Sequence, residues 1–545
     1  MIVEPDSSPA MEATLSSEAA RPAAAAQASE AARKWIIAVS VILCAALEVL
    51  DSSIVNVALP HMQGSFAAGV DEITWVVTTY LVAAGIMIPT TGWIAGQFGR
   101  KRYFLISITT FVISSAMCGA AQSLNQMVAF RFLQGIAGAA LQPLSQAILM
   151  ETFPPEEQTL AMAVWGMGMM VAPLLGPTVG GYITLNWNWR WNFYINVPTG
   201  IAAAFMVSTF VHDPSYLRRL KGTGRADWLG IVCLVIALGM GEIVMDRGER
   251  ADWFSAPWVW YFTLIAGSAL ITLIYHELHT PQPIIQLRLL KIKNFSLPTA
   301  LLITLIFTSY GMQILNPIFL QDLMGYTSWQ AGLLMLPRGL GLTAAMFFLG
   351  GIARRGYDTR PLVASGFVLV GVGLWLLGGL NLNMAVWNFV WPTVIQGIGM
   401  GLVFPNLSAA ALGSIPREQM GYATSLFSMT RNVFASVGTS VLTTLLVRRQ
   451  QAQQSYLVEH VSVFDAWRMS KQPAQMPGAP HFDIGQLVSG PKQGFAMIYA
   501  VVQGQAMMMS LNNIYRMLAG IMVVGFLLCS LLPGVRRKTA AITAH

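Results

Sequence analysis

Fourteen long apolar runs constrain what this chain can fold into. Each is about as long as the 20 residues that a helix needs to cross roughly 30 Å of hydrocarbon. Only helices and closed barrels satisfy their backbone in lipid, and the runs lack the strict alternation of barrel strands. We therefore expect an all-α membrane protein with spans at 36–58, 74–96, 103–122, 125–149, 159–183, 192–211, 227–246, 257–277, 295–320, 329–352, 361–380, 388–413, 421–447 and 513–533.

The composition excludes most other classes of protein. Of 545 residues, 10% are charged and 55% are hydrophobic, whereas about 25% are charged in a soluble domain. A soluble enzyme, a disordered protein and a nucleic-acid binder are therefore ruled out. The four cysteines are scattered and no His/Cys cluster has metal-ligand spacing, so we expect neither a disulfide, a metal nor a cofactor.

Basic residues predict the orientation. With a cytoplasmic N-terminus, about 20 of the 32 Lys and Arg fall on the inner side, whereas the short outer loops hold only Arg190, Arg247 and Arg250. This asymmetry predicts that both termini are cytoplasmic. The inner loop 151–157 is acidic and is an exception.

Three segments lie outside the spans. Residues 1–34, rich in Ala, Ser, Glu and Pro, are expected to be a disordered cytoplasmic tail, and 536–545 form the other tail. Residues 448–512 are expected to be an outer loop whose run 491–512 is an amphipathic helix lying on membrane lipid. A fifteenth span is the alternative, but several glutamines and asparagines in this run argue against it.

Two carboxylates lie inside the first span. Glu48 and Asp51 stand three residues apart on one helix face, roughly 20 and 24 Å along the helix from Trp35. A charge at this depth costs about 2.5–3.5 kcal/mol on insertion scales. Because burial disfavours the charged form, such a group can bind and release a proton during coupling. The alternative is a structural ion pair with a buried arginine.

A polar stripe on the fourth span supplies that arginine. Arg131, Gln134 and Gln142 recur with helical spacing, so they face a cavity or the bundle interior rather than lipid. Arg131 is the natural partner of a first-span carboxylate, and a snorkelling arginine is the alternative. Arg431 and Arg338 are further arginines within spans.

The ninth and twelfth spans carry further polar groups that can line a substrate cavity with Gln134 and Gln142. Interhelical hydrogen bonds are the alternative role. The groups are Tyr310, Gln313, Asn316, Gln396 and Asn406.

Missing motifs narrow the function further. The chain has no GxxxxGK[ST], so ATP bound to this chain does not drive it, and it has neither a nucleophile elbow nor HExxH. We therefore do not expect an enzyme. TVGYG is also absent, which disfavours a potassium channel.

Glycine-rich patterns mark the span ends and the fifth span. Gly92, Gly99, Arg100 and Arg102 belong to the inner loop between spans two and three. In span five, glycines that allow close helix approach surround a proline that can bend the helix; these residues are Gly176, Pro177, Gly180 and Gly181.

Taken in order, these motifs resemble the major facilitator superfamily, in its fourteen-span drug:proton antiporter branch of the EmrB type. The first-span stretch 50–60 (LDSSIVNVALP) is similar to that branch's signature, as are Asp246-Arg247-Gly248 and the run 191–198. The glycine-proline pattern of span five resembles the antiporter motif.

The resemblance implies two six-helix bundles, at 35–211 and 281–535, separated by two extra spans within 212–280. It also implies a periplasmic adaptor (membrane fusion) protein and an outer-membrane channel, with 448–512 as the docking surface. The family loop usually carries an Asp where this chain has Gly96. The gating contact that the family aspartate makes would then be made by Asp358 in this chain.

These observations predict a proton-coupled multidrug antiporter of a bacterial inner membrane. It would export hydrophobic or amphipathic toxic compounds. Asp51 would bind the proton, Glu48 would be a second carrier or would tune Asp51, and Arg131 would sharpen the coupling. One alternative is a proton-coupled uptake symporter for a nutrient or siderophore. Another is a membrane receptor that transports nothing.

Overall fold

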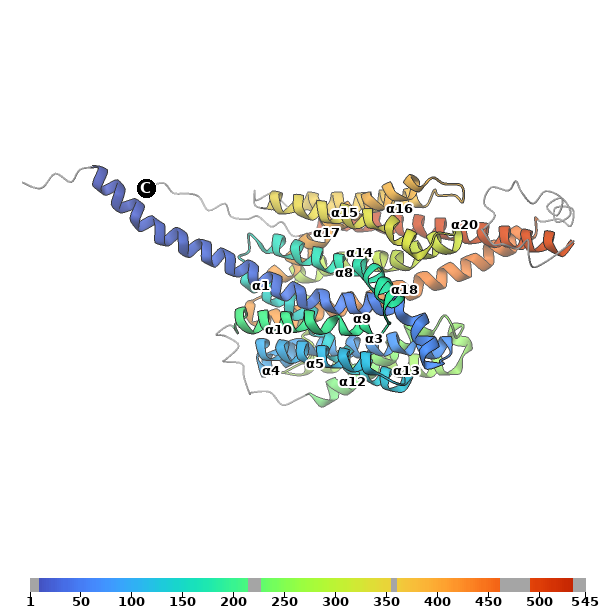
Figure 1. Ribbon diagram of the computed structural model, residues 1–545, viewed down its shortest axis with the longest axis horizontal. Coiled ribbons are helices and arrows are strands. Elements are labelled where there is room, and N and C mark those ends of the chain that lie inside the picture. Colours follow the sequence, from blue (N-terminus) through green and yellow to red (C-terminus); the bar gives the residue numbers. More distant parts are fainter. Residues whose placement is uncertain (1–8, 214–226, 354–359, 461–490, 533–545) are drawn as a thin grey trace, which may run out of the picture.

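The computed structural model describes residues 9–213, 227–353, 360–460 and 491–532, and throughout these ranges the regular elements are helices (Figure 1). Their bounds are α1 Pro9–Phe66, α2 Val70–Ile73, α3 Trp75–Met87, α4 Thr91–Phe98, α5 Arg100–Ala120, α6 Leu124–Gly138, α7 Leu141–Thr152, α8 Gln158–Asn186, α9 Trp191–Tyr194, α10 Asn196–Phe210, α12 Trp228–Arg247, α13 Pro257–His279, α14 Lys293–Ile318, α15 Ser328–Ala353, α16 Arg360–Leu377, α17 Val386–Gly413, α18 Met420–Val458 and α20 Pro491–Leu528.

Twelve helices in the described part of the chain are long and apolar enough to span a membrane, so the expected count of fourteen is not confirmed. The predicted span 125–149 is divided into α6 and α7, of 15 and 12 residues. Pro143 explains the division, because it has no N–H to donate to the carbonyl of Ala139. The predicted span 421–447 is the first part of the longer and more polar α18.

The first helix begins earlier than the sequence analysis expects. The backbone is helical from Pro9, within the segment 1–34 for which we expect disorder, and it continues without a break to Phe66. Alanine, the strongest helix former, is abundant in this stretch, which accounts for the difference. The portion suited to a membrane span is 32–66.

A helical hairpin replaces the expected surface helix at 491–512. These residues form the first part of α20, which runs on into the last span, while α18 extends to Val458. One of the glutamines that argued against a span pairs with the other helix: Gln450 Nε2 of α18 donates to Gln503 Oε1 of α20 at 2.9 Å. The hairpin α18–α20 projects at one end of the molecule (Figure 1). Residues 461–490, and the tail 536–545, lie outside the described ranges.

Helices from the first and last parts of the chain pack together along a central seam. α1 packs against α8 and α10, and α15 and α16 pack against α17. Across the seam, α8 contacts α15 and α17, while α18 contacts α4 and α7. The pair α12–α13 lies beside α3 and also contacts α18 through α12. The division into two six-helix bundles stays a prediction.

Candidate functional site

Asp51 is the centre of a buried polar cluster in the N-terminal part of the chain. Its Oδ2 accepts from Arg131 Nη1 at 2.6 Å, and its Oδ1 accepts from Gln134 Nε2 at 3.0 Å and Asn196 Nδ2 at 2.7 Å. Asp51, Gln134 and Asn196 are 0% exposed, and Arg131 is 1% exposed. The structure therefore joins α1, α6 and α10 around one carboxylate.

The surrounding helices hold Arg131 in place. Its Nε donates to the carbonyl of Val76 at 3.1 Å, and its guanidinium lies 4.2 Å from the ring centroid of Tyr80. Both partners come from α3. On the opposite side, Asn196 donates to Ser115 Oγ of α5 at 3.0 Å. Because each donor is itself positioned, the cluster is preorganised around a charged Asp51.

This geometry limits how Asp51 can exchange a proton. The carboxylate has no exposed surface in this conformation, and the guanidinium compensates its charge. A proton can reach it only when the helices that carry its donors move. The proton-coupling role of Asp51 therefore requires that the cluster opens, whereas a structural ion pair requires that it stays closed.

Glu48 belongs to a second cluster, which joins the two parts of the chain. It is 9% exposed and lies near Gln142 of α7, while its Oε2 has no hydrogen-bond partner among the described residues. Gln142 in turn accepts from Arg431 of α18, whose guanidinium lies 5.6 Å from the ring of Trp165. Glu48 is thus less completely compensated than Asp51, and it faces a residue from across the seam.

The other predicted cavity residues divide into two groups. Tyr310 and Gln313 on α14 are exposed, and Tyr310 lies near Arg431. Three others are almost completely buried: Asn316 accepts from Tyr515 Oη at 3.2 Å, Asn406 donates to the carbonyl of Leu402, and Gln396 has no hydrogen-bond partner among the described residues. Their role in a substrate cavity stays a prediction.

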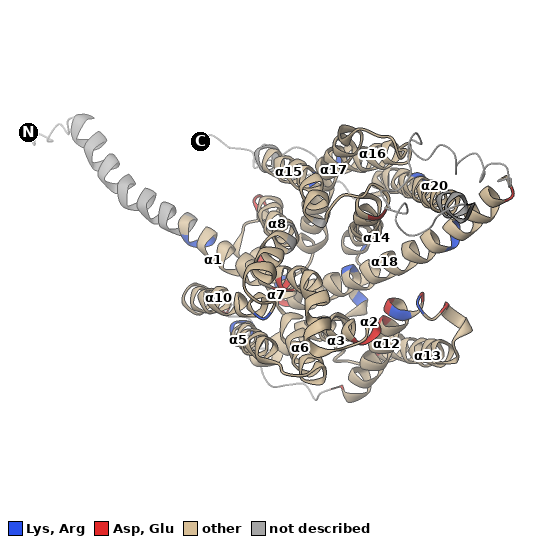
Figure 2. Cartoon of the chain, turned by 45° about the vertical axis from the view of Figure 1, so that its right-hand side comes forward, with Lys and Arg blue, Asp and Glu red and all other residues tan. Residues whose placement is uncertain are grey.

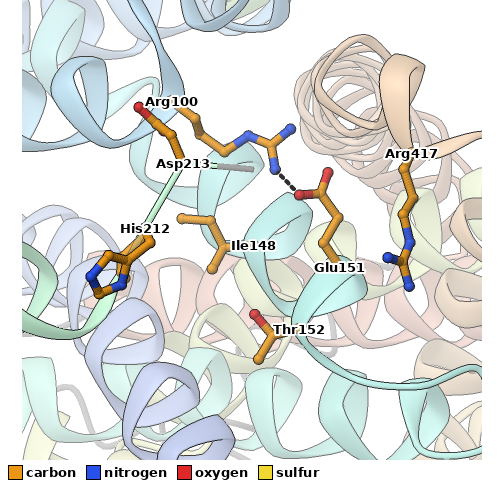
Figure 3. A pocket seen from close by; sticks show the side chains of 8 residues that line it. Arg100, Ile148, Glu151, Thr152, His212, Asp213 and Arg417 are labelled. Carbon is orange, nitrogen blue, oxygen red and sulfur yellow. Dashed lines mark hydrogen bonds and ion pairs between the residues drawn. The ribbon is translucent and has the colours of Figure 1, made fainter. Parts of the chain in front are cut away.

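A pocket of about 200 Å³ lies at the predicted inner end of the molecule (Figure 3). Arg100, at the start of α5, forms an ion pair with Glu151 at the end of α7, and Arg417 approaches the same pocket from the segment between α17 and α18. Nearby, Glu157 pairs with Lys34. These ion pairs account for the acidic loop 151–157, which balances basic residues of the same face.

The predicted gating glycines lie at close helix contacts. Gly99 has a φ of 89°, which separates α4 from α5, and Arg102 beyond it is exposed. A Cβ on Gly92 would lie 2.6 Å from the carbonyl oxygen of Gly421 in α18. Gly96, at the position of the family aspartate, lies close to Tyr422. Asp358 lies outside the described residues.

The glycine-proline pattern of α8 packs against α1. A Cβ on Gly176 would lie 2.2 Å from Ser53 Oγ, and one on Gly180 would lie 3.1 Å from Ile54. Gly181 has more room, and Pro177 lies between these glycines in the same helix. The pattern therefore brings α8 close to the helix that carries Asp51, two residues before Ser53.

The sequence analysis missed several members of these clusters. Asn196 and Ser115 are polar residues within apolar spans, and this is the signal that could have singled them out. Glu151 belongs to the unexplained acidic loop. Glu242, a carboxylate within the predicted span 227–246, was also overlooked although its signal equals that of Glu48.

The fold and buried clusters define a multi-pass α-helical membrane protein whose parts meet along a polar seam. The sequence model of the Major Facilitator Superfamily matches residues 41–439. The chain belongs to this superfamily, whose members are transporters rather than enzymes, and within it to the EmrB type. It is a multi-pass inner-membrane protein.

Curated relatives cover most of the chain. Multidrug export protein EmrB of Escherichia coli (strain K12) is 35% identical over 503 residues, covering 91% of this chain and 94% of that protein. Fatty acid resistance protein FarB of Neisseria gonorrhoeae is 35% identical over 439 residues, covering 80% and 85%. Among solved structures, the proton:xylose symporter XylE matches with a TM-score of 0.59 at 13% identity, covering 93% of this chain and 97% of that chain, which shows the fold alone.

Proposed function

We propose that the chain is a multidrug efflux transporter that exchanges hydrophobic or amphipathic drugs for protons. Export of drugs is supported by the similarity to EmrB proteins over 91% of the chain. Proton coupling is supported by one observation above the others: Asp51 is a buried carboxylate whose compensating donors come from α6 and α10. A motion that separates these helices removes the compensation, so the carboxylate then binds a proton.

Glu48 and Arg431 couple drug binding to proton binding in this proposal. Glu48 lies one helical turn from Asp51, and its cluster includes Arg431 from the other side of the seam. Closure of the seam brings Arg431 to Gln142, whereas opening leaves Glu48 accessible to a drug or to protons. The exposed Tyr310 and Gln313 extend this polar surface along α14.

The direction of coupling distinguishes the antiporter from its alternatives. Everted vesicles with an acid lumen should fill with a fluorescent cationic dye such as ethidium as protons leave, and the dye should in turn dissipate the pH gradient. A symporter would empty preloaded vesicles under the same gradient. A receptor would move no dye in either direction, so either result would overturn the proposal.

The projecting hairpin α18–α20 supports a proposal about partners. We propose that it docks a periplasmic adaptor, which connects to an outer-membrane channel, with both termini of this chain in the cytoplasm. Beyond the seam the two helices hold each other through glutamine pairs and through Ile498 and Val502 packed against Leu457. The hairpin therefore presents an ordered surface beyond the predicted membrane.

Deleting 455–505 tests this docking role. We expect the deletion to abolish drug resistance in cells, because the drug is no longer passed to a partner, while dye uptake by everted vesicles is retained. Resistance assays and vesicle uptake on the same variant measure the two effects. Unchanged resistance would show that the hairpin end is not needed for docking.

A further inference from the structure

Glu242 is a half-buried carboxylate within the most apolar of the twelve candidate spans. It lies on α12, roughly 21 Å along the helix from Trp228. The helix is one of the two extra spans, which the proposed function leaves without a role. Acidic side chains within spans are rare and mark functional positions by default.

The partners of Glu242 differ from those of Asp51. Its Oε1 accepts one hydrogen bond, from Ser436 Oγ of α18 at 2.6 Å. The acid nearest to it is Asp246, one turn further along α12, which accepts from Thr78 Oγ1 of α3 at 2.5 Å. Among the described residues, Glu242 therefore accepts from one neutral hydroxyl and has another acid nearby. Asp51, by contrast, accepts from a guanidinium and two side-chain amides.

No cation of α13 or α18, two helices packed against α12, pairs with Glu242 in the described part of the chain. On α18, Arg431 binds Gln142 and Arg448 lies 3.6 Å from Asp252. On α3, Tyr80 packs against Arg131 in the Asp51 cluster. No ion pair involves Glu242 in the part of the chain that the structure describes. A carboxylate in these surroundings lacks the compensation that a charge within an apolar span requires.

α12 bridges the seam through contacts of two kinds. Towards α3 it packs closely, because a Cβ on Gly239 would lie 3.2 Å from Ile86, and Arg247 lies 3.9 Å from the ring centroid of Trp75. Charged residues of α2 and α12 meet at this end (Figure 2). Towards α18, the polar contact within the span is Glu242 with Ser436.

We propose that Glu242 is a second proton-binding site of this transporter, one that senses the contact between α12 and α18. Separation of α18 from α12 removes the Ser436 donor and exposes the carboxyl group, which then exchanges its proton with water. Closure returns the neutral acid to its place in the seam. The inference rests on the proposed function, because it assigns a second site to the proton coupling proposed there.

Infrared difference spectroscopy of the purified full-length protein tests this site without a drug. Between about pH 5.5 and 8.5 exposed acids stay ionised, so the C=O stretch of a protonated carboxyl reports buried groups only. We expect Glu242→Gln to lose one component of this band and Glu242→Asp to retain a shifted one. Ser436→Ala should move the component to higher frequency, because the carbonyl loses a hydrogen bond.

Glu249→Gln is the matched control. Glu249 follows α12, and its Oε2 accepts from Trp253 Nε1 at 2.7 Å near the outer end, so this variant should give the wild-type band. A Glu242→Gln spectrum identical to that of the wild type would overturn the proposal. Failure of the proposed function has a different signature, since vesicles would then show no proton-linked dye movement whatever the band shows.

Discussion

Replacing Asp51 with asparagine is expected to reduce proton-driven dye uptake to the level of vesicles without the protein. The carboxamide has nearly the same shape as the carboxylate and still offers an acceptor to Asn196, but it cannot carry a proton. Dye uptake and pH-gradient dissipation in everted vesicles, normalised to the amount of folded protein, measure the effect. Wild-type exchange by Asp51→Asn would show that Asp51 does not carry the proton.

Folding must be separated from coupling in this experiment. Asp51→Asn leaves the guanidinium of Arg131 buried without its counter-charge, and breaking a buried pair in this way costs about 3–5 kcal/mol. The double variant Asp51→Asn with Arg131→Gln removes both charges and should recover stability without recovering exchange. Asp71→Asn, at an exposed outer acid whose side chain is 86% accessible, should behave as the wild type.

A side chain at Gly92 is expected to prevent closure of the seam at the predicted inner end. In Gly92→Val, the new Cβ would lie 2.6 Å from the carbonyl oxygen of Gly421 and 2.8 Å from the Cα of Tyr422. Both neighbours are backbone, so they cannot rotate away. Overpacking costs about 1–3 kcal/mol, which corresponds to a roughly 5- to 150-fold loss of the closed population.

Cysteine pairing across the seam measures this population. Ser428 Oγ lies 3.4 Å from Gln146 Oε1, so cysteines placed at these positions in a background without native cysteines should be joined by a short bifunctional thiol reagent in the closed state. Gly92→Val should slow this reaction and dye efflux together. Gly85→Val is the matched control, because nothing lies within 4 Å of a Cβ at that position on α3. Equal crosslinking in both variants would contradict the prediction.

The charges within apolar spans were the part of the site most accessible from the sequence. An unpaired charge within lipid is costly. The sequence therefore predicts that Asp51 and Arg131 pair, whatever the arrangement of the helices between them. Asn196 and Ser115 could not be assigned in this way, because amides and hydroxyls are tolerated at many helix interfaces. Their contribution depends on how α5 and α10 are placed beside α1, which no local pattern specifies.

The helix boundaries show a similar limit. Hydropathy located most spans, but it could not reveal that Pro143 divides α6 from α7 or that α20 continues through its glutamines. In the second case Gln503 bonds to Gln450 of α18, a partner more than 40 residues away in the chain. Reading this segment by itself therefore predicts a separate surface helix, whereas pairing with α18 accompanies its continuation into the last span.

The division of α6 from α7 places the polar residues of 124–152 on two short helices. Arg131 and Gln134 lie on α6, whereas Gln142, Gln146 and Glu151 lie on α7. A change in the angle between α6 and α7 would move Arg131, the partner of Asp51, relative to two residues of α7. These are Gln142, which lies near Glu48, and Glu151, which pairs with Arg100. Under the proposed function, proton binding at Asp51 would therefore be coupled through this joint to the predicted inner end of the molecule.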